Sequence, residues 1–145
     1  MTIKAFFSPE GGCLKTVLDG INKSQKSIDV AMFYFTSKAI AQALVAAKGR
    51  EVKIRIILDK NQEQETFSKS RYLIKKGIEV RYYQGEGLMH NKFAVIDGRL
   101  LITGSFNWTP TADWQNEENM IVIVNNEVVK KYQQRFAVLW KPAEA

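Results

Sequence analysis

The residue best suited to nucleophilic or acid–base chemistry is the one histidine of the chain, His90, which stands two positions before Lys92. In an extended segment, side chains two positions apart point to the same face, so the imidazole and the ammonium should lie side by side. A histidine beside a fixed cation suits attack on, or proton transfer to, an anionic phosphate group. The alternative interpretation is a surface histidine that only forms hydrogen bonds.

A second polar group follows in Gly104, Ser105 and Asn107. Glycine permits a close backbone approach, and Ser105 and Asn107 alternate onto one face as short hydrogen-bond donors. Such a pair can hold the non-bridging oxygens of a phosphate. A polar strand end or an asparagine turn is the alternative.

Acidic residues form the third group. Glu117 and Glu118 stand directly before a final apolar segment, where a carboxylate can accept the second ring N–H of His90 and stabilise its imidazolium form. The alternative for this pair is a solvated acidic loop. Asp97 precedes Gly98 in a pattern typical of a tight turn, so its role is either structural or one of charge support for the site.

The elements that must position these residues alternate along the chain. Apolar segments predict strands at 3–7, 27–35, 52–58, 78–83, 93–96, 100–103 and 119–124. Apolar residues at helical spacing predict helices around 14–21, from a cap at 36–37 to 48–50, over 66–76 with Phe67, Leu73 and Ile74 inward, and over 128–140. This order indicates an α/β fold in which a mixed, mostly parallel β-sheet is sandwiched between α-helices, with ligands at the strand ends.

The composition indicates one globular domain over residues 1–145. The chain is 46% hydrophobic and 25% charged, which excludes collagen-like, low-complexity and disordered classes. The single cysteine, Cys13, closes no intrachain disulfide. No spacing of cysteine, histidine or carboxylate residues is typical of a metal site, so we expect neither a metal nor another cofactor, and activity in the presence of a chelator.

The net charge of +6 and the pI of 9.4 favour a polyanionic partner, either nucleic acid or an anionic lipid surface. A charge excess that only keeps the protein in solution is the alternative. Candidate phosphate contacts are Lys60, Lys69, Arg71, Lys75 and Arg81, and candidate base-stacking groups are Tyr83, Trp108 and Trp114.

The apolar segments are all short. None approaches the length that spans a bilayer, and the first residues contain no leader as given, which argues against a membrane partner. A leader already removed would place the protein in the periplasm or outside the cell, and otherwise it is cytoplasmic, so the compartment stays open.

Together these groups resemble the signature elements of the phospholipase D superfamily. Its His-x-Lys-x4-Asp motif is matched by His90, Lys92 and Asp97, and its other elements match G-S-x-N at 104–107 and E-N at 118–119. The segments FSPEGG, ALVAAKGREVKIRIILD and GSFNWT also look like the small bacterial Nuc-type endonucleases of that superfamily.

The resemblance implies a metal-independent, two-step hydrolysis of phosphodiesters. One histidine attacks phosphorus to form a phosphohistidine, and a second histidine protonates the leaving oxygen. With one motif per chain, a homodimer must bring two copies of His90 together across a two-fold axis.

The resemblance also assigns roles to individual residues. The implied catalytic residues are His90, Lys92, Glu118 and Asp97, and the implied substrate contacts are Gly104, Ser105, Asn107 and Trp108. The substrate we expect is DNA, cleaved as a nonspecific endonuclease would, with single strands and RNA as alternatives. Phospholipid hydrolysis and a non-catalytic nucleic-acid-binding module remain the competing functions.

Overall fold

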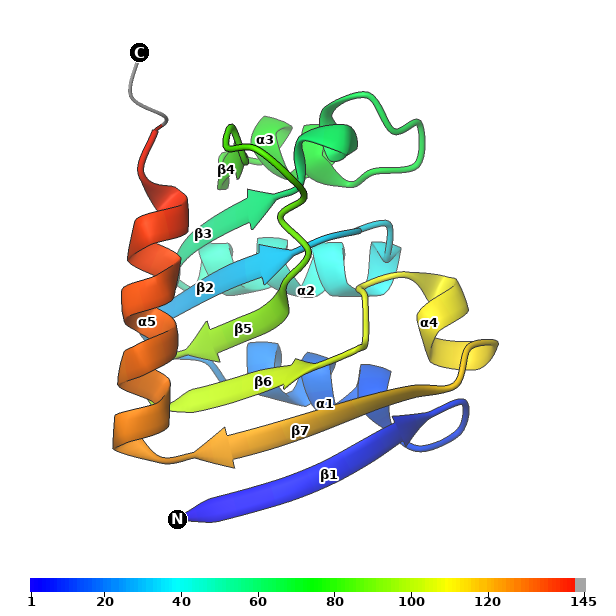
Figure 1. Ribbon diagram of the computed structural model, residues 1–145, viewed down its shortest axis with the longest axis vertical. Coiled ribbons are helices and arrows are strands. Elements are labelled where there is room, and N and C mark those ends of the chain that lie inside the picture. Colours follow the sequence, from blue (N-terminus) through cyan, green and yellow to red (C-terminus); the bar gives the residue numbers. More distant parts are fainter. Residues whose placement is uncertain (143–145) are drawn as a thin grey trace.

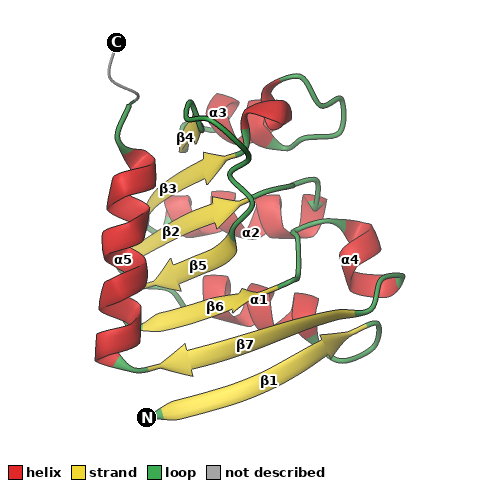
Figure 2. Cartoon of the chain, in the orientation of Figure 1, coloured by secondary structure: helices red, strands yellow, loops and turns green. Residues whose placement is uncertain are grey.

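The computed structural model describes residues 1–142, and its centre is one seven-stranded sheet that carries helices on both faces (Figures 1 and 2). Across the sheet the strands follow the order β1-β7-β6-β5-β2-β3-β4. Their bounds are β1 Thr2–Ser8, β2 Ser27–Met32, β3 Lys53–Leu58, β4 Glu79–Tyr82, β5 Lys92–Ile96, β6 Leu100–Gly104 and β7 Glu118–Val124.

The helices divide the apolar residues into two layers. Helices α1 and α2 lie against one face of the sheet, while α5 crosses the other face (Figure 2). The short α3, α4 and the 3₁₀ helix η1 lie beside the sheet, in the connections between strands. The bounds are α1 Cys13–Asn22, α2 Lys38–Gly49, η1 Lys60–Glu63, α3 Ser70–Lys75, α4 Pro110–Trp114 and α5 Asn126–Trp140.

The predicted mixed sheet is confirmed, but the prediction that it is mostly parallel is wrong for neighbouring strands. The β2–β3 and β3–β4 pairs are parallel, whereas β1–β7, β7–β6, β6–β5 and β5–β2 are antiparallel. Five strands run in one direction, and each of the two reversed strands, β5 and β7, lies between two of them (Figure 1). The short hairpin turn between β5 and β6 makes β5 run opposite to β6, because a tight turn can join neighbouring strands only when they are antiparallel.

The central strands are buried on both faces. Along β5, Phe93 and Val95 pack beneath α5, while Ala94 and Ile96 belong to the core under α1 and α2. Successive side chains of a strand point to opposite faces, so a strand between two helical layers must be apolar at almost every position. Polar side chains that do chemistry are therefore confined to the ends of the strands.

The predicted helix over 66–76 is shorter in the structure. It begins only at Ser70, because the preceding residues form a turn in which Ser68 N–H donates to Glu65 O and Lys69 N–H to Phe35 O. Phe67 is 73% exposed rather than directed inward, and Ile74 is exposed as well.

Helices α4 and η1 are present in the structure but were not predicted from the sequence. The signal for α4 was present: Thr109 accepts a hydrogen bond from Ala112 N–H as its cap, and proline occupies the first turn.

Candidate active site

The candidate residues gather at one edge of the sheet, where β1, β2, β3 and β6 end and β5 and β7 begin (the right-hand side of Figure 1). Lys92 is the first residue of β5 and Glu118 the first of β7. Their pairing partners, Met32 and Ser8, are the last residues of β2 and β1. The two reversed strands thus bring their first residues to the edge at which the other strands end.

His90 lies in the loop just before β5, exposed to solvent and close to Lys92 as predicted. The ammonium nitrogen of Lys92 is 3.0 Å from Nδ1 of the ring and 3.5 Å from Nε2. The imidazole also packs on Phe33, with 4.4 Å between ring centroids. Lys92 Nζ lies 5.6 Å from the Phe33 ring centroid. The histidine therefore contacts both a cation and an aromatic ring, which limits its orientation.

The charge of Lys92 depends on a nearby carboxylate. Burial lowers the pKa of Lys92 below its usual value, and the negative charge of Glu118 raises it again without restoring it. An ammonium that is partly removed from water loses hydration, so it releases its proton more readily unless an anion faces it. Glu118 is thus the group that helps to keep Lys92 cationic.

Ser105 and Glu118 form a hydrogen-bonded unit next to this pair. Ser105 Oγ donates to Glu118 Oε1 at 2.5 Å and accepts from the N–H of Asn119 at 3.1 Å. Asn116 Nδ2 donates to the second carboxylate oxygen at 3.3 Å. Within residues 1–142 of one chain, no hydrogen bond joins Glu118 to His90, so the predicted contact between them is not formed there.

Gly104 makes the contact between Ser105 and Glu118 possible. Its φ is +152°, and a Cβ at this position would lie 2.3 Å from the carbonyl oxygen of Asn119. A side chain at this position would push β6 away from β7. Because glycine has none, β6 approaches β7 closely enough for Ser105 to reach the carboxylate of Glu118. Gly104 therefore shapes the site through its backbone rather than by a side-chain contact with substrate.

Asn107 supports the loop after β2. Its side-chain oxygen accepts a hydrogen bond of 3.2 Å from the N–H of Tyr34. This fixes the amide orientation and leaves the NH₂ group as a donor. Asn107 can therefore act on a ligand as predicted, and it also orients the segment that carries Phe33.

The burial of the Trp108 ring argues against the predicted contact between this side chain and a substrate. Its ring is 2% exposed and packs edge-to-face on Phe35, with 5.2 Å between centroids. Its carbonyl oxygen accepts the N–H groups of Thr36 and Ser37. The ring belongs to the core and cannot stack on a base. Of the other aromatic candidates, Tyr83 packs against the α5 layer and Trp114 is 64% exposed.

Asp97 lies at the far end of β5, away from Lys92, so the structure does not bring it to the other candidates. Its carboxylate accepts the backbone N–H groups of Gln25, Lys26 and Ser27 at 2.7 to 3.1 Å. Burial raises the pKa of Asp97, but these hydrogen bonds outweigh it and hold the pKa below its usual value. Of the two interpretations of Asp97, the geometry favours the structural one: it joins the β5–β6 turn to the loop before β2.

Asp59 is a site residue that sequence reasoning missed. It is fully buried directly after β3, and its Oδ1 accepts the N–H of Met89 at 2.8 Å. Its Oδ2 accepts the N–H of Asn61 at 3.1 Å. A carboxylate at the carboxyl end of a buried strand was the available signal. By fixing Met89, Asp59 fixes the backbone next to His90.

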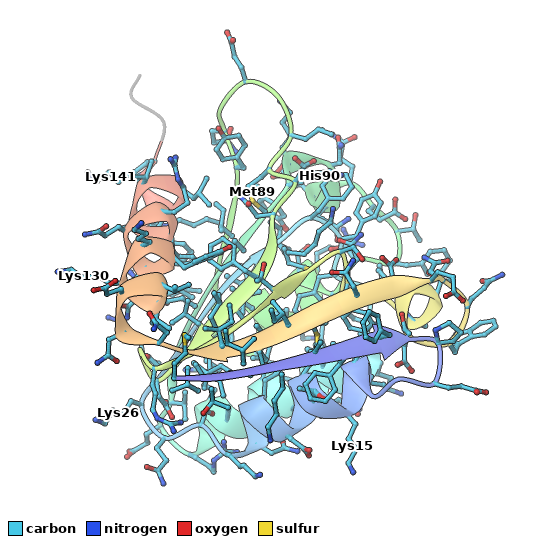
Figure 3. The ribbon with its side chains drawn as sticks, turned by 60° about the horizontal axis from the view of Figure 1, so that its bottom comes forward. Lys15, Lys26, Met89, His90, Lys130 and Lys141 are labelled. Carbon is cyan, nitrogen blue, oxygen red and sulfur yellow. The ribbon has the colours of Figure 1, made fainter. Side chains whose placement is uncertain are left out.

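Several basic residues lie away from this edge. The labelled lysines Lys15, Lys26, Lys130 and Lys141 are spread around the molecule, apart from His90 (Figure 3). Three candidate phosphate contacts are already engaged, and one of them, Lys60, donates to the carbonyl of Gly85 at 3.4 Å. Arg71 donates to the carbonyls of residues 63, 65 and 66, and Arg81 donates to the carbonyl of Trp140 and lies 4.1 Å from its ring centroid.

Neither a cluster of metal-binding side chains nor a membrane-spanning helix is present in the described part of the chain. Residues 1–142 contain no group of three or more histidine, cysteine or carboxylate side chains arranged to hold a metal ion. Over the same residues, no helix is at once long and apolar enough to cross a membrane.

Comparison with known proteins places the whole site inside one family. The sequence matches the family described as "Cardiolipin synthase, PLD-like domain" over residues 17–140. It is 37% identical over 134 residues to "Phospholipase D" of Rickettsia conorii, covering 92% of this chain and 67% of that protein. It is 38% identical over 118 residues to "Mitochondrial cardiolipin hydrolase" of Xenopus laevis, covering 81% of this chain and 56% of that protein. The chain thus spans between half and about two thirds of these curated relatives.

A solved structure matches over almost its full length. It is that of Nuc from Salmonella typhimurium, described as a phospholipase D family member, with a TM-score of 0.90 and 31% sequence identity. The alignment covers 96% of this chain and 93% of that one.

The role assigned to Asp97 predicts a stability effect. Asp97→Ala should lower the free energy of unfolding at pH 7 by about 1–2 kcal/mol, because backbone N–H groups lose a partly exposed acceptor. The pKa of Asp97 in the folded protein lies below its ordinary value of 3.8. The stabilisation is therefore complete at pH values above 3.8 and is lost as the pH falls through the pKa of the folded state. Urea unfolding at pH 7 and in strong acid measures the difference.

Asp97→Asn is the matched control, since it keeps an acceptor and tolerates the φ of 57° at this position. It should be destabilised less than Asp97→Ala. Equal stability of the alanine variant and the wild type at pH 7 would contradict the assignment.

Proposed function

The chain belongs to the PLD-like domain family, as its signature residues predicted, and on that premise we propose that it is a nuclease that cleaves phosphodiesters through a phosphohistidine. The proposal rests on the pair formed by His90 and Lys92 at an exposed edge of the sheet, where Nζ of Lys92 lies 3.0 Å from Nδ1 of His90. A nucleophile and a cation side by side suit an anionic phosphorus centre.

The proposed reaction has two steps. In the first, an imidazole nitrogen of His90 attacks phosphorus, and the bond from phosphorus to the leaving oxygen breaks. That oxygen keeps the electron pair and takes a proton from a second imidazolium. In the second step this imidazole takes a proton from water, and the water oxygen attacks phosphorus and releases His90.

The neighbouring residues stabilise the charge that develops on phosphorus. The Lys92 ammonium and the Asn107 amide supply donors for the non-bridging oxygens, whereas the one hydrogen of the Ser105 hydroxyl is already donated to Glu118. Removing one such donor from an enzyme costs about 2.7–4 kcal/mol of transition-state stabilisation. Glu118 contributes through its neighbours, because it orients the Ser105 hydroxyl and helps to keep Lys92 charged.

The second histidine must come from a second chain, because the sequence contains one. A two-fold axis near His90 would bring two copies together, as isologous dimers do. Exposed apolar side chains at the same edge support such an interface. Phe7 near the end of β1, Leu88 before His90, and Trp114 on α4 are 58%, 54% and 64% exposed.

DNA or RNA is the substrate that we favour. The fold matches that of Nuc with a TM-score of 0.90 at 31% sequence identity, and the Nuc-type proteins that the signature residues resemble are endonucleases. The net charge of +6 also suits a polyanion. Phospholipid hydrolysis is the second candidate, because the names of the phospholipase D and cardiolipin hydrolase relatives favour it.

The proposed nuclease activity should depend on His90 and not on a metal ion. Wild-type protein should cleave single-stranded oligonucleotides and supercoiled plasmid in excess EDTA, and His90→Ala should lose at least about a thousandfold in rate because the covalent step is removed. Gel assays with equal amounts of folded protein, checked by circular dichroism, make the measurement. DNA binding without cleavage at any pH would favour a non-catalytic binding module, and liposome hydrolysis without DNA cleavage would favour the phospholipase.

A second prediction concerns pH. Glu118→Gln removes the charge that raises the pKa of Lys92, so Lys92 should lose its proton at a lower pH. We expect severalfold lower activity at neutral pH and an alkaline limb of kcat/KM that moves to lower pH. Glu117→Gln, the neighbouring carboxylate, is the matched control and should leave the profile unchanged. A wild-type profile in Glu118→Gln would remove the assignment.

A third prediction concerns assembly. Sedimentation at active concentrations should give twice the monomer mass of 16.6 kDa. Trp114→Asp should shift the protein toward monomers and lower the specific activity, because a charge would be buried in the interface. A fully active wild-type monomer would exclude the two-histidine mechanism.

A further inference from the structure

A cavity of about 410 Å³ opens beside the candidate active site, between the loop after β3 and the start of α4. Its lining is mainly apolar and includes Tyr34, Phe67 and Pro110, together with the charged side chains of Glu65 and Lys69. The volume falls within the roughly 300–1,000 Å³ of sites that bind small molecules. None of the chemistry described so far uses this cavity.

A row of contacting aromatic rings connects the cavity to His90, the proposed nucleophile. The His90 and Phe33 rings are 4.4 Å apart, and the Phe33 and Tyr34 rings are also 4.4 Å apart and nearly parallel. Tyr34 then lines the cavity. Because two ring-to-ring steps separate the cavity from His90, its occupant would belong to the part of the substrate next to the reacting phosphate.

Phe67 presents an aromatic surface to the solvent without an internal partner. It is 73% exposed, and Tyr34 is 37% exposed. A single exposed phenylalanine is common on protein surfaces. Here it borders a cavity that a second aromatic ring also lines, and this combination suits a flat ligand.

The loop that carries Phe67 is held in place by hydrogen bonds. Lys69 N–H donates to Phe35 O at 2.9 Å, and Arg71 donates to the carbonyls of Glu63, Glu65 and Thr66. The cavity is therefore preformed, and a ligand need not order the loop when it binds.

We propose that this cavity binds one unpaired nucleobase of the nucleotide next to the cleaved phosphate, stacked on Phe67. The inference rests on the proposed nuclease function and deepens it, because a base can enter only from a single strand or after it leaves the duplex. Stacking on an aromatic face accepts any base, so the stacking contact selects strandedness, and a base preference would come from Glu65 alone.

The two charged side chains fit a nucleotide better than the alternatives. Lys69 can contact a phosphate of the same strand, while Glu65 can accept hydrogen bonds from amino groups on a base edge. A second backbone phosphate in the cavity would face the carboxylate of Glu65. A lipid acyl chain would leave both charges without a polar partner.

The test uses a short single-stranded oligonucleotide of deoxycytidines with one cleavable phosphodiester, the remaining linkages being methylphosphonates. Two analogues lack the base on the 5′ or the 3′ side of that phosphodiester. For the wild type, loss of the base on one side should raise KM about 10-fold. Phe67→Ala should raise KM for the complete oligonucleotide by a similar factor. For the analogue that already lacks the stacked base, Phe67→Ala and the wild type should have the same KM.

Two variants serve as controls. Phe67→Trp restores a stacking surface and should keep a KM close to that of the wild type. Val138→Ala removes a comparably exposed side chain on α5, across the sheet, and should change nothing. Circular dichroism of each variant excludes misfolding as the cause of a raised KM.

The outcomes separate the two proposals. If the wild type cleaves the oligonucleotides and Phe67→Ala has no effect, or raises KM equally for all three, only the cavity assignment is overturned. The same holds if Phe67→Ala lowers hydrolysis of anionic phospholipid vesicles alone, since the occupant would then be an acyl chain. If the wild type cleaves neither these substrates nor unmodified single strands, the nuclease function fails as well.

Discussion

The burial of the central sheet on both faces is the constraint on which the site depends. Because helices cover each face, the interior positions of β2, β3 and β5 are apolar apart from the ion pair of Asp29 on β2 and Arg55 on β3, and the polar groups of the candidate site lie at the strand ends. The reversal of β5 and β7 places their first residues at the edge where β1, β2, β3 and β6 end. Lys92 and Glu118 thereby meet the loops that carry His90 and Ser105.

Around these residues, other groups fix the geometry without contact with the substrate. Asp59 holds the backbone before His90, Gly104 allows β6 to approach β7, and the Asn107 side chain holds the loop that carries Phe33. A buried carboxylate such as Asp59 is tolerated because both of its oxygens accept backbone N–H groups. Misplacement of a reacting group by about 1 Å can cost a hundredfold in rate, so this supporting layer matters as much as the donors do.

Much of this arrangement could be predicted from the sequence, and the failures have physical causes. Apolar periodicity located the sheet strands and α1, α2 and α5, because burial sets that pattern directly. The pairing of His90 with Lys92 followed from spacing alone. Strand order could not be predicted from periodicity, because periodicity shows which side chains are buried but not which strands are adjacent. The number of antiparallel strand pairs was therefore predicted too low.

Individual side chains were harder to assign, because tertiary contacts decide whether a residue is exposed. Trp108 looked available for stacking but fills the core, whereas Phe67 looked buried but borders an open cavity. Asp97 fits the signature motif, and only the structure shows that its carboxylate binds the loop before β2 instead of the site.

The most direct test of the central claim, covalent catalysis by His90, is the stereochemical course at phosphorus. A phosphodiester made chiral by sulfur and labelled oxygen is hydrolysed, and the configuration of the product is determined by NMR. Two successive in-line displacements through a phosphohistidine predict retention of configuration. Inversion would show that water attacks phosphorus directly, and it would contradict the role assigned here to His90.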